Sequence, residues 1–228
     1  MLLLCLAQAR YNSVMHADNI TLLCKVKYNW PMNESKSNIL QAASDLFLEG
    51  GTAALSVRAI AGRAGISTIG IYSHFQGKQG ILDTLYIEGF NAVIAALTVE
   101  DTVGDPRERV LLCSRRYLDT AEVYEPHYSL IFGKLDDSYR PSGEARLMGA
   151  KGFSILTEVV GGLLGADAAA SARRDVALQV WALMHGFVGL KNHAVAELVD
   201  MRCWKERAMD AVVIQVDGII SRGRTGLS

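Results

Sequence analysis

The sequence is poor in cysteine, carries almost no net charge and lacks an apolar run near the length of a membrane-spanning helix. Its four cysteines, Cys5, Cys24, Cys113 and Cys203, are scattered without the spacing of a metal site or a redox motif. We therefore predict a reduced cytoplasmic protein with no metal and no cofactor. Because no long apolar run is found, no membrane partner is expected.

The two signs of charge are nearly equal, with 23 Lys and Arg against 24 Asp and Glu. Residues 33–80, which carry the main motif, hold four basic and three acidic residues. The basic surface that is typical of a nucleic-acid-binding domain is therefore missing. Any DNA contact would depend on a few cations of the motif, on helix ends and on dimerisation.

At 228 residues and 50% hydrophobic, the chain can bury one large core, or a small core and a medium one.

Signatures of catalysis are missing as well. The five histidines, His16, His74, His127, His185 and His193, have no nucleophile elbow of the G-x-S-x-G kind beside them. The sequence also has no glycine-rich phosphate loop. These absences predict that the protein is not an enzyme; a catalytic C-terminal domain is the alternative, which a turnover screen would test. No segment alternates like a strand, so the expected fold class is all-α.

The most informative segment is SVRAIAGRAGISTIGIYSHF, which begins at Ser56. Ser56 is placed to cap a short helix, and Gly65 stands where a helix end favours a left-handed residue. Ser67 is placed to cap a second helix, with Ile66 and Ile71 forming a hydrophobic staple around that cap. Two short helices joined by a tight glycine turn predict a helix-turn-helix, whose second helix enters the DNA major groove.

The helices that flank this motif extend the pattern. From Ile39 to Leu85 the chain reads ILQAASDLFLEGGTAALSVRAIAGRAGISTIGIYSHFQGKQGILDTL. This segment resembles the DNA-binding domain of the tetracycline-repressor (TetR) family of bacterial transcription regulators, most specifically in IYSHF followed by Gly77 and Lys78. The resemblance implies a helix-turn-helix domain of three helices over residues 33–80. It also implies a helical effector-binding and dimerisation domain over residues 81–228.

The resemblance further implies which residues contact a double-stranded DNA operator. Those in the first turn of the recognition helix would reach base edges, and the others would lie at phosphates. The predicted DNA-contacting residues are Arg58, Ser67, Thr68, Ile69, Gly70, Tyr72, His74 and Lys78.

The recognition helix also departs from the family pattern. Family members often carry Lys or Arg beside its cap, where this chain has Thr68. Gly70 is unusual inside a helix and costs about 1 kcal/mol relative to Ala. A degenerate helical ligand-binding scaffold without specific DNA binding is therefore a second alternative, which a DNA-binding assay would separate from a regulator.

The first 31 residues differ in character from the rest. Their apolar start, MLLLCLAQAR, lacks the basic region and the full apolar core of a signal peptide. Pro31 interrupts the chain, and the following Met32 resembles a natural start for the family. We expect residues 1–31 to be a disordered extension or a mis-assigned start. The rival interpretation is an arm that places Lys25 and Lys27 in the DNA minor groove.

Beyond about residue 95 we expect helices and loops. Asp105 and Pro106 predict a helix start, Pro126 predicts a break, and residues 135–143 read as a loop. The later helices are expected over about residues 127–132, 144–164, 168–196 and 204–221.

The last two helices have apolar faces, at residues 180–188 and 212–220, that are too large for solvated helices. In the TetR family the last two helices form a four-helix dimer interface, so the resemblance implies a two-fold homodimer. The candidate effector pocket mixes apolar walls with polar tips, which suits a mostly apolar ligand with one or two hydrogen-bonding groups. Its candidate residues are Tyr117, Tyr124, Tyr128, Phe132, Met148, Phe153, Trp181 and His185.

These features together predict a ligand-responsive, DNA-binding transcription regulator. The favoured interpretation is a repressor that binds a palindromic operator as a homodimer and is released by a small effector. Because linkage is reciprocal, DNA would then weaken effector binding by the same factor by which the effector weakens DNA binding.

Overall fold

The computed structural model describes residues 34–99, 104–132, 139–191, 193, 196 and 198–225, and these residues form helices and connecting turns without a strand. The expected all-α fold class is therefore confirmed. The described chain divides into two compact units, one ending at Ile81 and the other beginning at Leu82. The expectations for residues 1–31, and for residues 135–138 of the loop expected over residues 135–143, lie outside the described residues.

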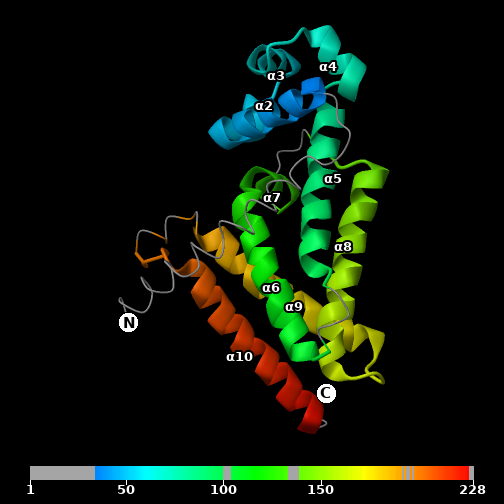
Figure 1. The fold of residues 1–228 in the computed structure, drawn as a ribbon, viewed down its shortest axis with the longest axis vertical. Helices are drawn as coiled ribbons and strands as arrows, with labels where there is room; N and C mark the ends of the chain where they lie inside the picture. The colour runs from blue at the N-terminus through cyan, green and yellow to red at the C-terminus, as the bar shows by residue number, and fades with distance from the viewer. Residues whose placement is uncertain are drawn as a thin grey trace. The chain divides into compact units, whose positions relative to one another are not determined.

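The first unit is built from short helices around a small aliphatic core. It contains α2 (Glu34–Gly50), the 3-10 turn η1 (Gly51–Ala54), α3 (Val57–Ala64), α4 (Thr68–Phe75) and the first turn of α5 (Lys78–Leu97). Helix α2 packs on α3, and α3 packs on α4 (Figure 1). The core of this unit includes Ile39, Leu40, Ala43, Ile60, Ile71 and Ile81.

The second unit is a bundle of longer helices. It contains the rest of α5, α6 (Pro106–Val123), α7 (Glu125–Phe132), α8 (Gly143–Gly161), the 3-10 turn η2 (Gly162–Leu164), α9 (Ala170–Lys191) and α10 (Trp204–Thr225). Helix α9 packs against α8 and α10, and α10 also packs along α6 (Figure 1). Residues at helical spacing on the inner faces form one core, including Val110, Tyr117, Leu156, Val180, Met184, Val212 and Val216.

The helix starts follow local signals more closely than the helix ends do. Asp105 caps α6 and Pro106 is its first residue, as predicted. Helix α7 begins at Glu125 instead of residue 127, because a proline is tolerated in the first turn, where no intrahelical N–H bond is lost. Helix α9 ends at Lys191 and not near residue 196, since apolar spacing does not mark where a helix gives way to turns.

Two apolar segments of the described chain reach the length of a membrane span. Lys78–Leu97 and Gly143–Leu164 are long and apolar enough to cross a bilayer by length and composition. The sequence prediction that no segment approaches this length is therefore wrong. The evidence for a membrane is weak, however, because a core helix of a soluble protein meets the same criterion.

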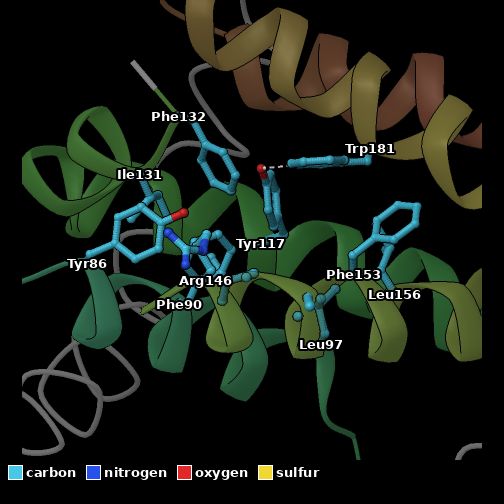
Figure 2. A pocket seen from close by; sticks show the side chains of 14 residues that line it. Tyr86, Phe90, Leu97, Tyr117, Ile131, Phe132, Arg146, Phe153, Leu156 and Trp181 are labelled. Carbon is cyan, nitrogen blue, oxygen red and sulfur yellow. Dashed lines mark hydrogen bonds between the residues drawn. The ribbon is translucent and has the colours of Figure 1, made fainter. Parts of the chain in front are cut away.

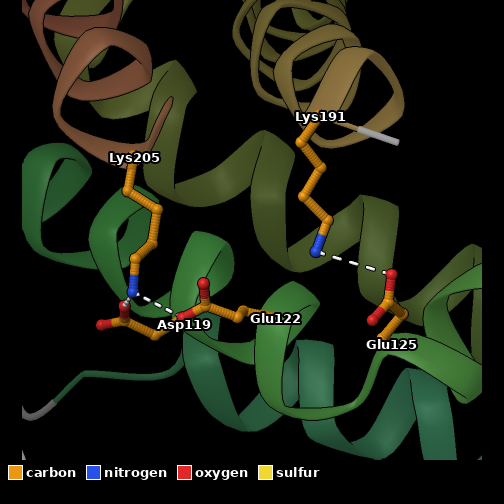
Figure 3. Close-up of polar contacts among 5 residues, drawn as sticks. All are labelled: Asp119, Glu122, Glu125, Lys191 and Lys205. Atoms are coloured by element: carbon orange, nitrogen blue, oxygen red, sulfur yellow. Dashed lines mark hydrogen bonds and ion pairs between the residues drawn. The ribbon is translucent and has the colours of Figure 1, made fainter. Parts of the chain in front are cut away.

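Ion pairs join helices of the second unit where α6 meets α7. The Lys205 ammonium, at the start of α10, lies 2.9 Å from the Asp119 carboxylate and 2.7 Å from that of Glu122, both on α6. Lys191, at the end of α9, lies 3.7 Å from Glu125 at the start of α7 (Figure 3). These pairs tether α9 and α10 to the junction of α6 and α7.

Candidate functional site

Two regions can be built from the predicted residues, a helix-turn-helix in the first unit and a cavity in the second. The helix-turn-helix forms as predicted, with both serine caps and the glycine turn in place. The Ser56 hydroxyl accepts a hydrogen bond from the Ala59 N–H at 3.0 Å, which caps α3. Gly65 ends α3 with φ 68°, in the left-handed region. The Ser67 hydroxyl accepts a bond from the Gly70 N–H at 3.2 Å, which caps α4.

Helix α4 has a buried face and an exposed face. Ile71 and Phe75 point into the core of the first unit, so they anchor the helix. Thr68, Ile69 and Tyr72 are exposed, with 78% of Ile69 and 59% of Tyr72 open to solvent. Two large apolar side chains on one exposed face of an eight-residue helix suit contact with another surface.

A glycine supports the Tyr72 ring. Gly77 follows α4 with φ 104°, and a Cβ at this position would lie 3.1 Å from the Tyr72 ring. Gly77 therefore allows both the left-handed turn and the close approach of Tyr72. Gly70, the departure noted in the sequence, is half-buried, and a Cβ there would lie 3.3 Å from the Ile66 side chain.

The cations of the motif differ in how they are held. The Arg63 guanidinium makes two bonds to the Glu49 carboxylate, at 2.9 and 2.8 Å, and its charge is paired. Lys78 is half-buried, and its Nζ donates to the Thr52 carbonyl at 3.1 Å. Because that carbonyl is neutral, Lys78 keeps a net positive charge at the start of α5. Arg58 is exposed on α3, and His74 is half-buried on α4.

A cavity of about 430 Å³ that opens to solvent lies between the helices of the second unit. Apolar and aromatic side chains from α5, α6, α7, α8 and α9 form most of the wall (Figure 2). Gly149 and Gly152 on α8 leave room for the Phe90 ring, because a Cβ at either position would lie 3.3 Å from it. The lining residues are Tyr86, Phe90, Val93, Leu97, Tyr117, Ile131, Phe132, Arg146, Gly149, Ala150, Gly152, Phe153, Leu156 and Trp181.

A hydrogen-bonded chain of four side chains starts at this cavity. The Trp181 Nε1–H donates to the Tyr117 hydroxyl at 3.1 Å. The Tyr117 and Tyr128 hydroxyls lie 2.9 Å apart, and the Tyr128 hydroxyl lies 2.6 Å from His185 Nδ1. Burial raises the pKa of Tyr117 to about 12, raises that of Tyr128, and lowers that of His185. All three groups are therefore neutral near pH 7.

A second cavity, of about 210 Å³, lies at the His185 end of this hydrogen-bonded chain. Phe132 lines both cavities, and Tyr128 and His185 line the second. Glu125 and Lys191 also line it, so this cavity is more polar than the first.

The predicted pocket residues fall into three groups. Tyr117, Phe132, Phe153 and Trp181 line the first cavity, and Tyr128 and His185 line the second with Phe132. Tyr124 and Met148 line neither of these two cavities. Tyr124 caps the end of α6 and its ring packs edge-on against His127, at 5.7 Å between centroids. Met148 is half-buried on α8.

The sequence did not indicate the contribution of α5 to the wall, and it indicated that of α8 only through Phe153. Tyr86, Phe90 and Arg146 were missed, because their positions in ordinary helices say nothing of which neighbours they face. The two glycines inside α8, three residues apart, were the available signal, since interior helix glycines often mark close packing.

Comparison with family models matches both units. Residues 39–85 match the model described as bacterial regulatory proteins of the tetR family. Residues 110–200 match the model described as a tetracyclin repressor-like C-terminal domain.

Curated relatives and solved structures agree with these matches. The chain is 28% identical over 117 residues to the HTH-type transcriptional repressor KstR2 of Mycobacterium tuberculosis. The matched residues cover 50% of this chain and 56% of KstR2. It is also 28% identical over 145 residues to the HTH-type transcriptional activator FasR of Mycolicibacterium smegmatis, covering 63% of this chain and 65% of FasR. The matches thus span somewhat more than half the length of these relatives.

Solved structures share the fold at lower identity. A bacterial regulatory protein of the tetR family from Rhodococcus RHA1 superposes with a TM-score of 0.65 at 20% identity, covering 81% of this chain and 98% of that chain. The TetR family transcriptional regulator PfmR from Thermus thermophilus gives a TM-score of 0.57 at 20% identity, covering 80% and 97% of the two chains.

Proposed function

Because this chain belongs to the TetR family of bacterial transcription regulators, we propose that it binds a palindromic operator as a homodimer and releases it when a small effector occupies the cavity of the second unit. The observation that carries this proposal is the exposed face of α4. Thr68, Ile69 and Tyr72 stand open on a helix that is anchored by buried Ile71 and Phe75. A helix held in this way can present its first turn to base edges in a major groove.

The charged groups near α4 support a DNA contact of modest salt dependence. Arg58 is exposed and Lys78 holds its charge at a helix N-terminus, where N–H groups also attract phosphate. Arg63 is neutralised by Glu49 and is not expected to contribute. With so few phosphate contacts per protomer, two linked recognition helices are needed for useful affinity.

Helices α9 and α10 support the homodimer. Their inner residues are buried within the chain, whereas Leu178 and Ile214 on their outer faces are 52% and 74% exposed. Gly186 and Gly218 are exposed on the same two helices and would let a second pair of helices approach closely. Exposed apolar and small residues on both helices fit a two-fold interface, in which the same surface of each copy meets the other.

Helix α5 offers a route for the effector response. It is one continuous helix whose first turn belongs to the unit with α4 and whose later residues Tyr86, Phe90 and Leu97 line the cavity. An effector that prefers a different position of α5 would shift the dimer away from its operator-binding state. Couplings of this kind typically amount to about 1–3 kcal/mol. Repression is the favoured sign, although the relatives named above include one repressor and one activator.

Fluorescence anisotropy with labelled DNA from upstream of the gene tests the proposal. We expect tight binding that an unrelated duplex does not compete for, and that weakens modestly between about 50 and 200 mM salt. Tyr72→Ala and Ile69→Ala should each weaken the specific complex at least about tenfold, a loss typical of one good contact. Leu147→Ala on α8 is the matched control, since Leu147 is also an exposed apolar residue.

If neither this DNA nor any duplex from a random-sequence selection binds specifically, the proposal fails and the degenerate-scaffold alternative is favoured. If specific binding is found but the α4 variants leave it unchanged, the recognition helix has been assigned wrongly.

A further inference from the structure

The cavity of the second unit has a single charged residue in its wall. Among the lining residues, Arg146 is the only one with a charged side chain of the Lys, Arg, Asp or Glu type. Arg146 is exposed to solvent, whereas the lining residues Tyr117, Val93 and Leu156 are buried. Figure 2 shows its guanidinium on the side of Tyr86 and Phe90, with Tyr117 and Trp181 on the other side. The positive charge therefore lies at the mouth of an otherwise apolar cavity.

The Arg146 guanidinium is oriented but not neutralised. Its Nη1 donates to the Pro141 carbonyl at 2.8 Å, which uses one of five N–H donors and leaves the charge intact. Among the described residues no carboxylate forms an ion pair with it. A guanidinium held in this way is well suited to a carboxylate, which it can bind through two parallel hydrogen bonds.

The deep end of the cavity has no charged group, and its polar atoms are hydrogen-bonded to one another. The indole N–H of Trp181 donates to the Tyr117 oxygen. The Tyr117 hydroxyl is bonded to that of Tyr128, which is bonded in turn to His185 Nδ1. An anionic group placed beside Tyr117 would lose its hydration and meet no positive charge there.

From these two ends we infer the chemical class of the effector: a molecule with an apolar body and a single anionic end group, such as a carboxylate, with the anion at Arg146. The inference rests on the proposed role of this cavity as the effector site. The body fills the aromatic part of the cavity without hydrogen bonds, and Arg146 selects the anion. Tyr86, a phenol kept neutral by the burial that raises its pKa, lies on the same side and can donate to the same end group.

Calorimetric titration of the full chain with three probes of one chain length tests the inference: decanoate, 1-decanol and decyltrimethylammonium. We expect decanoate to bind at least about tenfold more tightly than decanol, as one exposed charge-assisted contact allows. The cation should bind more weakly than either. Arg146→Gln should weaken decanoate binding about tenfold and leave decanol unchanged, and Arg146→Lys should recover part of the loss. Arg174→Gln, an exposed arginine of α9 outside the cavity, should change neither.

Equal affinity for decanoate and decanol, or decanoate binding that Arg146→Gln does not weaken, would overturn the inference, as would a protein that binds none of the probes. The same samples in the DNA anisotropy assay separate this result from the proposed function. Anion-selective binding by a protein without specific DNA binding would refute the regulator and leave the ligand class standing. Specific DNA binding without anion selectivity would refute the ligand class and leave the regulator standing.

Discussion

At the scale of single residues, the hydrogen-bonded chain from Trp181 to His185 joins side chains of three helices. The Trp181 indole N–H donates to Tyr117, the two tyrosine hydroxyls are bonded to each other, and the Tyr128 hydroxyl is bonded to His185 Nδ1. These bonds tie α6, α7 and α9 together through the wall of the cavity, so losing one hydroxyl disturbs all three helices.

Replacing Tyr117 with Phe should destabilise the protein. The change removes the acceptor of the half-buried Trp181 N–H and the hydrogen-bond partner of the Tyr128 hydroxyl, and an unsatisfied buried group costs about 1–3 kcal/mol. Urea unfolding, followed by far-UV circular dichroism, would measure the loss. The matched control is Tyr72→Phe, which removes an exposed hydroxyl and should stay within about 0.5 kcal/mol of the wild type. Equal stability of the two variants would show that the hydrogen-bonded chain of side chains contributes nothing to the free energy of unfolding.

Protonation of His185 should weaken the same hydrogen-bonded chain of side chains and destabilise the folded protein. Burial lowers its pKa below the ordinary 6.5, so the unfolded protein takes up the proton first as the pH falls. The contribution of His185 is then complete above about pH 6.5 and is lost as the pH falls toward its folded-state pKa. His185→Asn keeps an acceptor near Nδ1 but cannot titrate. Between about pH 7.5 and pH 5.5, the urea midpoint should fall further for wild type than for His185→Asn. Parallel curves for the two proteins would contradict this expectation.

At the scale of secondary-structure elements, the turn from α4 to α5 depends on a glycine. A Cβ at Gly80 would collide with the carbonyl oxygen of Phe75, a backbone atom that cannot move aside without shifting the end of α4. Gly62, inside α3, meets nothing within 4 Å. Gly80→Ala should therefore destabilise the first unit by about 1–3 kcal/mol. Gly62→Ala should stabilise it by up to about 1 kcal/mol, because Ala favours the helix. Thermal unfolding of the two variants should shift in opposite directions, and two shifts of the same sign would refute the packing seen at Gly80.

The element scale also explains what the sequence could predict. The helix-turn-helix is encoded locally: Ser56, Gly65 and Ser67 act on residues within four positions of themselves, so their roles could be read from spacing alone. The cavity is different, because Trp181 meets a partner 64 positions away. Helical periodicity identifies a buried face but does not say which helix covers it. Tyr117 and Trp181 could therefore be proposed, whereas Tyr86 and Arg146 could be found only in the folded chain.

At the scale of the whole molecule, the apolar faces of α9 and α10 are used within the chain itself. The sequence singled out residues 180–188 and 212–220 for the dimer interface. In the structure Val180, Met184, Val212 and Val216 of these segments are buried in the core of their own chain. What remains for a partner is the opposite side, which carries Leu178, Ile214 and the exposed glycines. An interface between copies would therefore rest on small and isolated apolar residues, and one buried charge should be enough to break it.

Ile214→Glu should convert a dimer into a monomer. In a two-fold interface each copy would introduce one carboxylate, and burying two unpaired charges costs more than an interface of a few apolar residues can offset. Sedimentation equilibrium would show the change in mass, and circular dichroism would confirm that the 74% exposed position tolerates Glu in the folded chain. Leu147→Glu is the matched control, since Leu147 is 71% exposed but lies on α8, and it should leave the dimer intact. Operator affinity should fall with the loss of the dimer, because a monomer holds only one half-site. A dimer that survives Ile214→Glu, or a monomer that binds the full operator as tightly as wild type, would place the interface elsewhere on the molecule.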